Sequence, residues 1–304
     1  MPFNDFRKFD IMKELLLEYE EYLRKEKVAE NTLSSYLRDA EAFLSYLKEG
    51  RIKSPLNVKK ITIDAYVERL KDLGRANSTI SRTVAALRKF YGFLQQSGKI
   101  EKNPVNTIEV PRVKKKVPEA LTTREIVKLL NQPKPTDLKG IRDKAMLELL
   151  YATGIKVSEI ITLTLRDVDL KGGMISCGTD KNERYIPIGK EAADALDEYI
   201  KKARGYMTKE TKVKNLFVNC SGTPLTRQGF WKILRVYAQQ AGIKTQINAQ
   251  TLRNSFAVHL LQNGADINAV SEMLGHNDVV TTRVYNQVLK NNIKKIYKKA
   301  HPRA

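Results

Sequence analysis

Cysteine is scarce in this sequence, with only Cys177 and Cys220 among 304 residues. They form no CxxC metal-binding pattern, and two distant cysteines do not make a disulfide framework. We therefore expect a reduced, cytoplasmic protein that needs no metal or other cofactor. No apolar run approaches the roughly 20 residues that cross a bilayer, and the polar segment 1–10 is not a signal peptide.

Acidic residues are also few relative to basic ones. Lys and Arg total 54 against 34 Asp and Glu, which gives a formal net charge of +20 and a pI near 9.7. Such an excess favours a polyanionic partner, and nucleic acid fits best. The alternative is a basic protein whose charge serves only solubility. With 42% hydrophobic residues, the chain can bury the core of one large domain or two medium ones.

The first 110 residues have the pattern of a helical domain. Apolar residues recur at helical spacing from Leu33 to Leu47, with Asn31 as a candidate cap and Gly50 as a stop signal. A second helix is predicted near 78–96, where Ile80, Val84, Leu87, Tyr91 and Leu94 form one face.

Prolines at 104, 111 and 118 bracket a run of basic residues, which predicts an exposed linker. A capping box from Thr122 to Glu125 then opens a new helix. We place the domains at 1–112 and 120–304, with the linker at 113–119.

The second part mixes helices with a hairpin. Short β-prone runs on either side of a Gly/Asp/Asn cluster predict a hairpin over 173–188. Helices are predicted near 138–151, 158–165, 190–204, 226–241, 251–262, 266–274, 278–286 and 289–299.

Three segments of this second part carry an ordered pattern: YATGIKVSEI at 151–160, QTLRNSFA at 250–257 and LGHNDVVTTRVY at 274–285. Together they resemble the three boxes of the tyrosine recombinases, and the ending YKKAHPRA is similar to the tail of the bacterial Xer-type members. The resemblance covers nearly the whole chain. It implies a mainly α fold with a small β-sheet, in which an all-helical, SAM-like core-binding domain precedes a mixed α/β catalytic domain. It also implies DNA strand exchange through a 3′-phosphotyrosyl intermediate, without a nucleotide or a metal.

The resemblance assigns a role to each matched position. Tyr285 matches the nucleophile, Arg253 matches the arginine of the second box, and His276 matches the His/Trp position of the third. Lys156 stands where the family has its first catalytic Arg, and Gln250 stands where it has His. Lysine supplies charge without the planar fork that binds a phosphate through two hydrogen bonds. Glutamine forms hydrogen bonds but does not shuttle a proton near neutral pH.

The 5′ oxygen that leaves also needs a proton, which a lysine of the hairpin supplies in the family. A strict overlay places Thr179 at that position. Lys181, two residues further on, is the best candidate for the proton donor, and Lys171 is a weaker one.

Double-stranded DNA is the expected partner, bound by a homo- or hetero-tetramer on paired sites, as the family implies. We expect phosphate contacts from Lys114, Lys115 and Lys116 in the linker, and from Arg82, Arg88 and Lys89 in the first domain. For these last three, a solvated charged helix face is the alternative.

Two functions remain open from the sequence. The favoured one is a site-specific recombinase, slowed by Lys156 and Gln250, because Tyr285, Arg253 and His276 are all kept. The alternative is a catalytically impaired homologue that binds DNA as an architectural or regulatory protein. A plain repressor-like protein would leave the three boxes unexplained.

Overall fold

The chain forms two compact units, residues 1–114 and 115–304. The structure, a computed structural model, describes residues 4–52, 54–110, 118–178, 183–209, 213–245 and 247–275, and residues 4–10 by their backbone alone. The division between the units falls at Lys114 and Lys115, inside the predicted linker. The bounds 113 and 119 stay a prediction, because residues 111–117 lie outside the described part.

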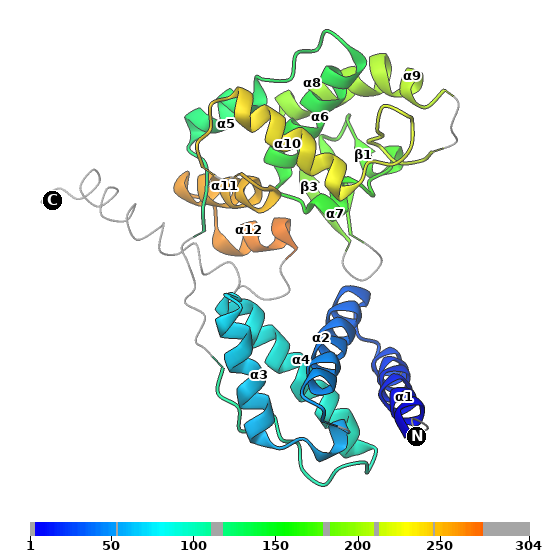
Figure 1. Ribbon diagram of the computed structural model, residues 1–304. Helices are drawn as coiled ribbons and strands as arrows, with labels where there is room; N and C mark the ends of the chain where they lie inside the picture. Colours follow the sequence, from blue (N-terminus) through cyan, green and yellow to red (C-terminus); the bar gives the residue numbers. More distant parts are fainter. Residues whose placement is uncertain are drawn as a thin grey trace, which may run out of the picture. The chain divides into compact units, whose positions relative to one another are not determined.

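The regular elements described in the first unit are all helical (Figure 1). Its elements are α1 (Asn4–Lys25), α2 (Glu30–Glu49), the 3-10 turn η1 (Pro55–Asn57), α3 (Lys60–Asp72) and α4 (Asn77–Gln96). The predicted apolar face of α4 is confirmed, since Ile80, Val84, Leu87, Tyr91 and Leu94 are all buried. Six aromatic side chains are buried in this core: Tyr19, Phe43, Tyr66, Phe90, Tyr91 and Phe93.

The predicted end of α2 is confirmed and its predicted start is wrong. Gly50 caps the C-terminus, where its N–H donates to the carbonyl of Tyr46. The N-cap is Ala29 rather than Asn31, and Asn31 lies inside the first turn. The carbonyl of Ala29 accepts from the N–H of Leu33, so the helix begins two residues earlier than a side-chain cap would indicate.

The second unit combines a small sheet with helices (Figure 1). Its elements are α5 (Thr123–Leu130), α6 (Leu138–Thr153), α7 (Val157–Ile160), the 3-10 turn η2 (Leu165–Asp167), β1 (Val168–Asp169), β2 (Met174–Cys177), β3 (Arg184–Pro187), α8 (Lys190–Tyr199), the π-helical turn η4 (Ile200–Arg204), α9 (Gly205–Met207), α10 (Arg227–Gln240), α11 (Ala249–Gln262) and α12 (Ile267–Leu274). The capping box of α5 is confirmed, since Glu125 N–H donates to Thr122 and the Thr122 N–H donates to Glu125.

The sheet is antiparallel in the order β1-β2-β3, so the predicted hairpin is confirmed and β1 is an addition to it. Ile175 pairs with Ile186, and both side chains are fully buried. The same register pairs Cys177 with Arg184. Because side chains alternate along a strand, Arg184 lies two positions from Ile186 on the face that is turned toward the core.

Two helix predictions are wrong in their extent. The helix predicted over 158–165 is only the single turn α7, and a 3-10 turn follows before β1. α7 ends at Ile160, and Thr164 caps the start of the following 3-10 turn, where its hydroxyl and N–H donate to the carboxylate of Asp167. The helix predicted over 190–204 is α-helical only to Tyr199. The helices predicted at 278–286 and 289–299 lie outside the described residues. None of the helices in the described part is long and apolar enough to cross a membrane.

Candidate active site

Arg253 lies at the centre of the candidate site, on α11. Only 3% of the residue is exposed. Its Nη1 donates to the carbonyl of Gly154 at 2.6 Å, and its Nη2 donates to the carbonyl of Leu274. The second box therefore contacts the first box at Gly154 and the start of the third at Leu274.

Gly154 makes this approach possible. It caps the C-terminus of α6 with a left-handed φ of 59°, and a Cβ there would lie 2.3 Å from the ring of Phe256. Only glycine adopts that backbone without strain and leaves space for the ring. The first box thus turns sharply at Gly154, and its carbonyl faces the Arg253 guanidinium.

Lys156 follows that turn as the N-cap of α7, and its side chain is exposed. Its backbone N–H donates to Oε2 of Glu159 at 2.7 Å. Glu159 is thus tied to the start of the helix, in the way a Glu at the third helical position usually is. The Lys156 backbone lies two residues from the Gly154 carbonyl that Arg253 binds.

Arg184 of β3 connects this turn to α12. Its two terminal nitrogens donate to the two carboxylate oxygens of Glu159, at 2.8 and 3.0 Å. Its Nε donates to the carbonyl of Met273 at 2.8 Å. The ion pair is largely buried, with 11% of the Arg184 side chain and 16% of the Glu159 side chain exposed.

The charges in this region are mutually compensated. Burial alone would disfavour the Glu159 carboxylate, but hydrogen bonds from Arg184 and from the Lys156 backbone hold its pKa below the ordinary value. Burial raises the pKa of the neighbouring Cys177 thiol to about 11, so this cysteine stays neutral. Cys177 is 4% exposed and packs in the hydrophobic core of this unit.

Gln250 lies on α11 one turn before Arg253 and is exposed. Its amide nitrogen donates to Oδ1 of Asn254 at 2.9 Å, and Asn254 donates to the carbonyl of Glu119 at 3.0 Å. Glutamine can donate such a hydrogen bond, although it cannot transfer a proton as histidine does.

The described structure thus brings together Lys156, Gln250 and Arg253 among the predicted site residues. Tyr285, His276, Lys181 and the linker lysines Lys114, Lys115 and Lys116 lie outside the described residues. Two residues of the site had no predicted role, Glu159 and Arg184. The spacing of Glu159 from the N-cap at Lys156 was a usable signal. Arg184 gave none, because its partners lie 25 and 89 residues away.

Each of the three cations predicted to bind DNA in the first unit has a partner within that unit. Arg82 pairs with the buried Asp39 at 2.8 Å. Lys89 contacts Glu26 and the ring of Tyr22. Arg88 points toward the carbonyls of Val105 and Ile108, at 3.4 to 3.5 Å. That these cations contact DNA stays a prediction.

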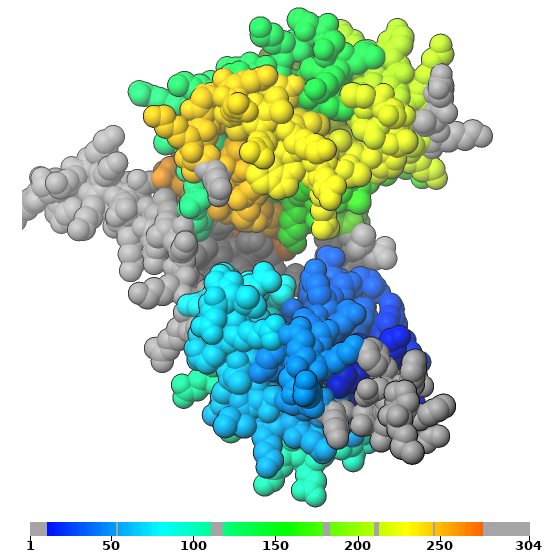
Figure 2. Space-filling model, viewed as in Figure 1, coloured from blue at the N-terminus to red at the C-terminus, as the bar shows by residue number. Residues whose placement is uncertain are grey.

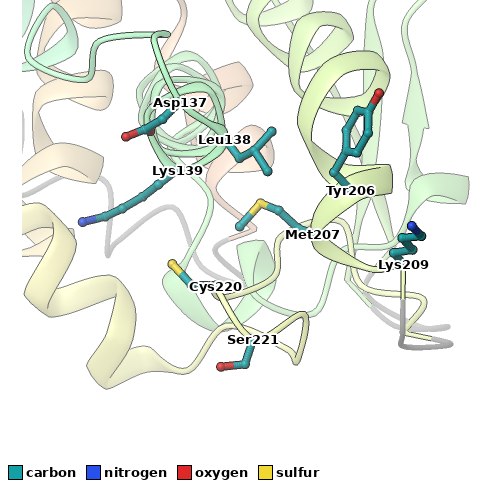
Figure 3. A pocket seen from close by; sticks show the side chains of 8 residues that line it. All are labelled: Asp137, Leu138, Lys139, Tyr206, Met207, Lys209, Cys220 and Ser221. Atoms are coloured by element: carbon teal, nitrogen blue, oxygen red, sulfur yellow. The ribbon is translucent and has the colours of Figure 1, made fainter.

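Two hollows on the second unit lie apart from the candidate residues. One of about 700 Å³ is bordered by Tyr206 and Met207 on one side and by Cys220 and Ser221 on the other (Figure 3). The other, of about 630 Å³, lies beside α10 and is lined by Trp231, Arg235 and Lys244, among others. Figure 2 shows α10, in yellow, on the surface of this unit. Among the residues that the structure describes, no three His, Cys, Asp or Glu side chains group as metal ligands would.

Residues 119–292 match the model of the phage integrase family, and residues 16–98 match its N-terminal SAM-like domain. The chain belongs to the phage integrase family, as a tyrosine recombinase.

Relatives support this over nearly the full length. A protein named tyrosine recombinase XerD from Halalkalibacterium halodurans is 43% identical, over 94% of this chain and 97% of the relative. Tyrosine recombinase XerD from Staphylococcus haemolyticus is 39% identical, over 96% of this chain and 100% of the relative. The crystal structure of XerA recombinase is similar with a TM-score of 0.55 and 25% identity, over 96% of this chain and 100% of that chain. XerH bound to its difH substrate has the same fold, with a TM-score of 0.71 and 21% identity, over 92% of this chain and 84% of that chain.

Proposed function

We propose that this chain carries out site-specific recombination, with Tyr285 as the nucleophile that breaks and rejoins DNA strands. The tyrosine oxygen attacks the scissile phosphate, which leaves a 3′-phosphotyrosyl bond and a free 5′ hydroxyl. Attack by a 5′ hydroxyl of another strand reverses the step and releases the tyrosine. The energy of the broken phosphodiester is kept in the covalent intermediate, so the reaction needs no nucleotide.

The observation that supports this proposal most is that Arg253 contacts both other boxes. Its guanidinium is fixed by carbonyls of the first box, at Gly154, and of the third, at Leu274. Negative charge develops on the non-bridging phosphate oxygens during the attack, and preorganised cations lower that barrier. Arg253 is the planar, permanently charged group suited to this role. Lys156 supplies a second cation, two residues from the Gly154 carbonyl that Arg253 binds.

The other roles follow the same chemistry. His276 directly follows Gly275, and we assign it a hydrogen bond to a phosphate oxygen or to Tyr285. Gln250 orients without transferring protons. Lys181 supplies the proton to the leaving 5′ oxygen, a role for which an ammonium group with three donor hydrogens is suited. The relatives and the described structure do not show impaired catalysis, and the substitutions at 156 and 250 are tested below.

The proposed substrate is duplex DNA, bound in the cytoplasm by a tetramer on paired sites. The net charge of +20 supports this partner. So does the exposed face of α10, where Arg227, Trp231, Lys232 and Arg235 place three cations around an aromatic ring. Among proteins of the same fold, XerH is described bound to difH, and lambda integrase as a dimer bound to a core site.

A nicked duplex tests the proposal. When the strand is nicked just beyond the scissile phosphate, cleavage releases a short fragment and the rejoining step fails. The proposed activity predicts that a covalent protein–DNA adduct accumulates and survives denaturation. If no adduct forms on any duplex that the protein binds selectively, the alternative of a DNA-binding homologue replaces this proposal.

A further inference from the structure

Arg184 makes contacts that extend beyond its own strand. The register of β2 and β3 directs it toward the core beside Cys177, where an unpaired cation would be costly. Three of its nitrogens are hydrogen-bonded, two to Glu159 of α7 and one to the Met273 carbonyl at the end of α12. One guanidinium therefore joins the hairpin, the first box and the residues just before the third.

The two carbonyls at the end of α12 are held by different arginines. Arg184 binds the carbonyl of Met273, and Arg253 binds that of Leu274. A cation near the carbonyl end of a helix is favoured by the helix dipole, and these last carbonyls have no partner within the helix. Two arginines from different elements therefore hold the backbone at the start of the third box.

Glu159 connects Arg184 to the backbone of Lys156. Its Oε2 accepts both from Arg184 and from the Lys156 backbone N–H, at 3.0 and 2.7 Å. A continuous series of hydrogen bonds thus runs from Lys156 through Glu159 and Arg184 to Met273.

We propose that Arg184 is a positioning residue for strand cleavage, which holds the start of the third box in a fixed relation to Lys156 and Arg253. This inference rests on the proposed function. Arg184 itself does not touch the phosphate in this account. It acts through the backbone at Met273 and Gly275, the residue directly before His276.

Stability alone is a poor explanation for this ion pair. Two charges removed from water gain little net stability, and apolar residues of similar size often stabilise a core as well. What the pair adds is geometry, since a planar fork fits one orientation of one carboxylate. Lysine at this position would keep the charge and lose two of the three directed bonds.

The test compares Arg184→Lys, Arg184→Gln and Glu159→Gln with the parent protein. Lys201→Gln is the matched control, because Lys201 belongs to the same unit and its ion pair with Asp197 is exposed. We expect single-turnover cleavage of the nicked duplex to fall about 100-fold in the three site variants, since small misplacements of reacting groups cost that much. DNA affinity should stay close to that of the control. The unfolding midpoint should fall in Arg184→Gln and Glu159→Gln, because each leaves a largely buried charge without its partner, so cleavage is measured at a temperature at which every variant is folded.

A substrate with sulfur in place of the bridging 5′ oxygen separates positioning from proton donation. A thiolate leaves without being protonated, so this substrate restores cleavage only where the proton donor is misplaced. We expect no restoration in the Arg184 variants, because their defect lies at the third box. Restored cleavage would overturn the proposal, as would parental cleavage by Arg184→Lys or a loss explained by weaker binding or unfolding.

Amide hydrogen exchange provides a readout that does not depend on activity. The amide of Lys156 and the amides of Met273 to Gly275 should exchange faster in Arg184→Gln than in Lys201→Gln. Unchanged exchange would overturn the positioning role even in a protein that cleaves. If the parent forms no adduct, the proposed function fails, and faster exchange would still assign Arg184 as the residue that fixes this turn.

Discussion

The guanidinium of Arg184 lies directly against the backbone of Gly275, where a Cβ would be 2.8 Å from its Cζ. Gly275 also caps α12 with a left-handed φ of 62°. Both facts require glycine at this position, the first for space and the second for conformation. The glycine of the LGH motif is thus explained by the arginine of a distant hairpin.

Gly275→Ala should destabilise the second unit by about 3 kcal/mol or more, because it adds backbone strain and disturbs a buried ion pair. Gly242→Ala is the control, since Gly242 has a similar φ of 67° but no atom within 4 Å of an added Cβ. That change should cost only about 1 kcal/mol of strain. Equal costs in urea unfolding would show that Arg184 does not pack against residue 275.

Lys156→Arg combined with Gln250→His should accelerate cleavage. The first change restores the fork for phosphate and the second restores a proton shuttle, and a well-placed acid–base group contributes about 10²–10⁴-fold. Both side chains are exposed, so the larger groups can be accommodated. Single-turnover rates on the nicked duplex measure the effect, with Lys201→Arg as the control. A rate that is flat or lower would mean that the site has adapted to Lys and Gln.

Replacing Lys114, Lys115 and Lys116 by Ala should weaken DNA binding and flatten its salt dependence. Each lost phosphate contact lowers the slope of log affinity against log salt by about 0.9. Lys201 and Lys202 provide the control, because both pair with acidic neighbours on the same helical face. DNA affinities measured from low to high salt give this slope for the parent, the linker variant and the control. A parent slope near zero would contradict the electrostatic account of binding.

His259 should make stability depend on pH. The His259 side chain is buried, and its Nδ1 is hydrogen-bonded to the hydroxyl of Tyr151 at 2.9 Å. Burial holds the pKa of His259 below the usual 6.5. The unfolded chain therefore takes up this proton more readily, so stability is lost as the pH falls below about 6.5. Every tenfold difference in proton affinity corresponds to about 1.4 kcal/mol. His259→Gln should reduce the loss seen in urea unfolding between pH 7.5 and 5.5. An identical loss in both proteins would exclude His259 as its source.

The sequence predicted the helices well where local signals were strong. The apolar face of α4, the Gly50 stop and the Thr122 capping box depend on neighbouring residues, and the structure confirms each. The start of α2 was missed because Ala29 caps it through its backbone alone and gave no side-chain signal. The single turn of α7 was missed because the chain starts a separate 3-10 turn at Thr164, which the carboxylate of Asp167 caps.

The candidate site was predictable only in part for the same reason. Ordered motifs pointed to Arg253, Lys156 and Gln250, and the fold brings them together. The contact of Arg184 with Met273 spans 89 residues and depends on strand register and on a left-handed glycine, which no local pattern encodes. The capping pattern predicts the hydrogen bond from the Lys156 N–H to Glu159, but it does not predict the hydrogen bond from Arg184.

Identifying the residue that carries the DNA tests the central claim most directly. The adduct from a nicked duplex would be digested with protease, and the peptide that retains the oligonucleotide would be sequenced by mass spectrometry. We predict a single peptide that contains Tyr285 joined to a 3′ phosphate, and no adduct from Tyr285→Phe at unchanged DNA affinity. An adduct on another residue, or one that persists in Tyr285→Phe, would contradict the account.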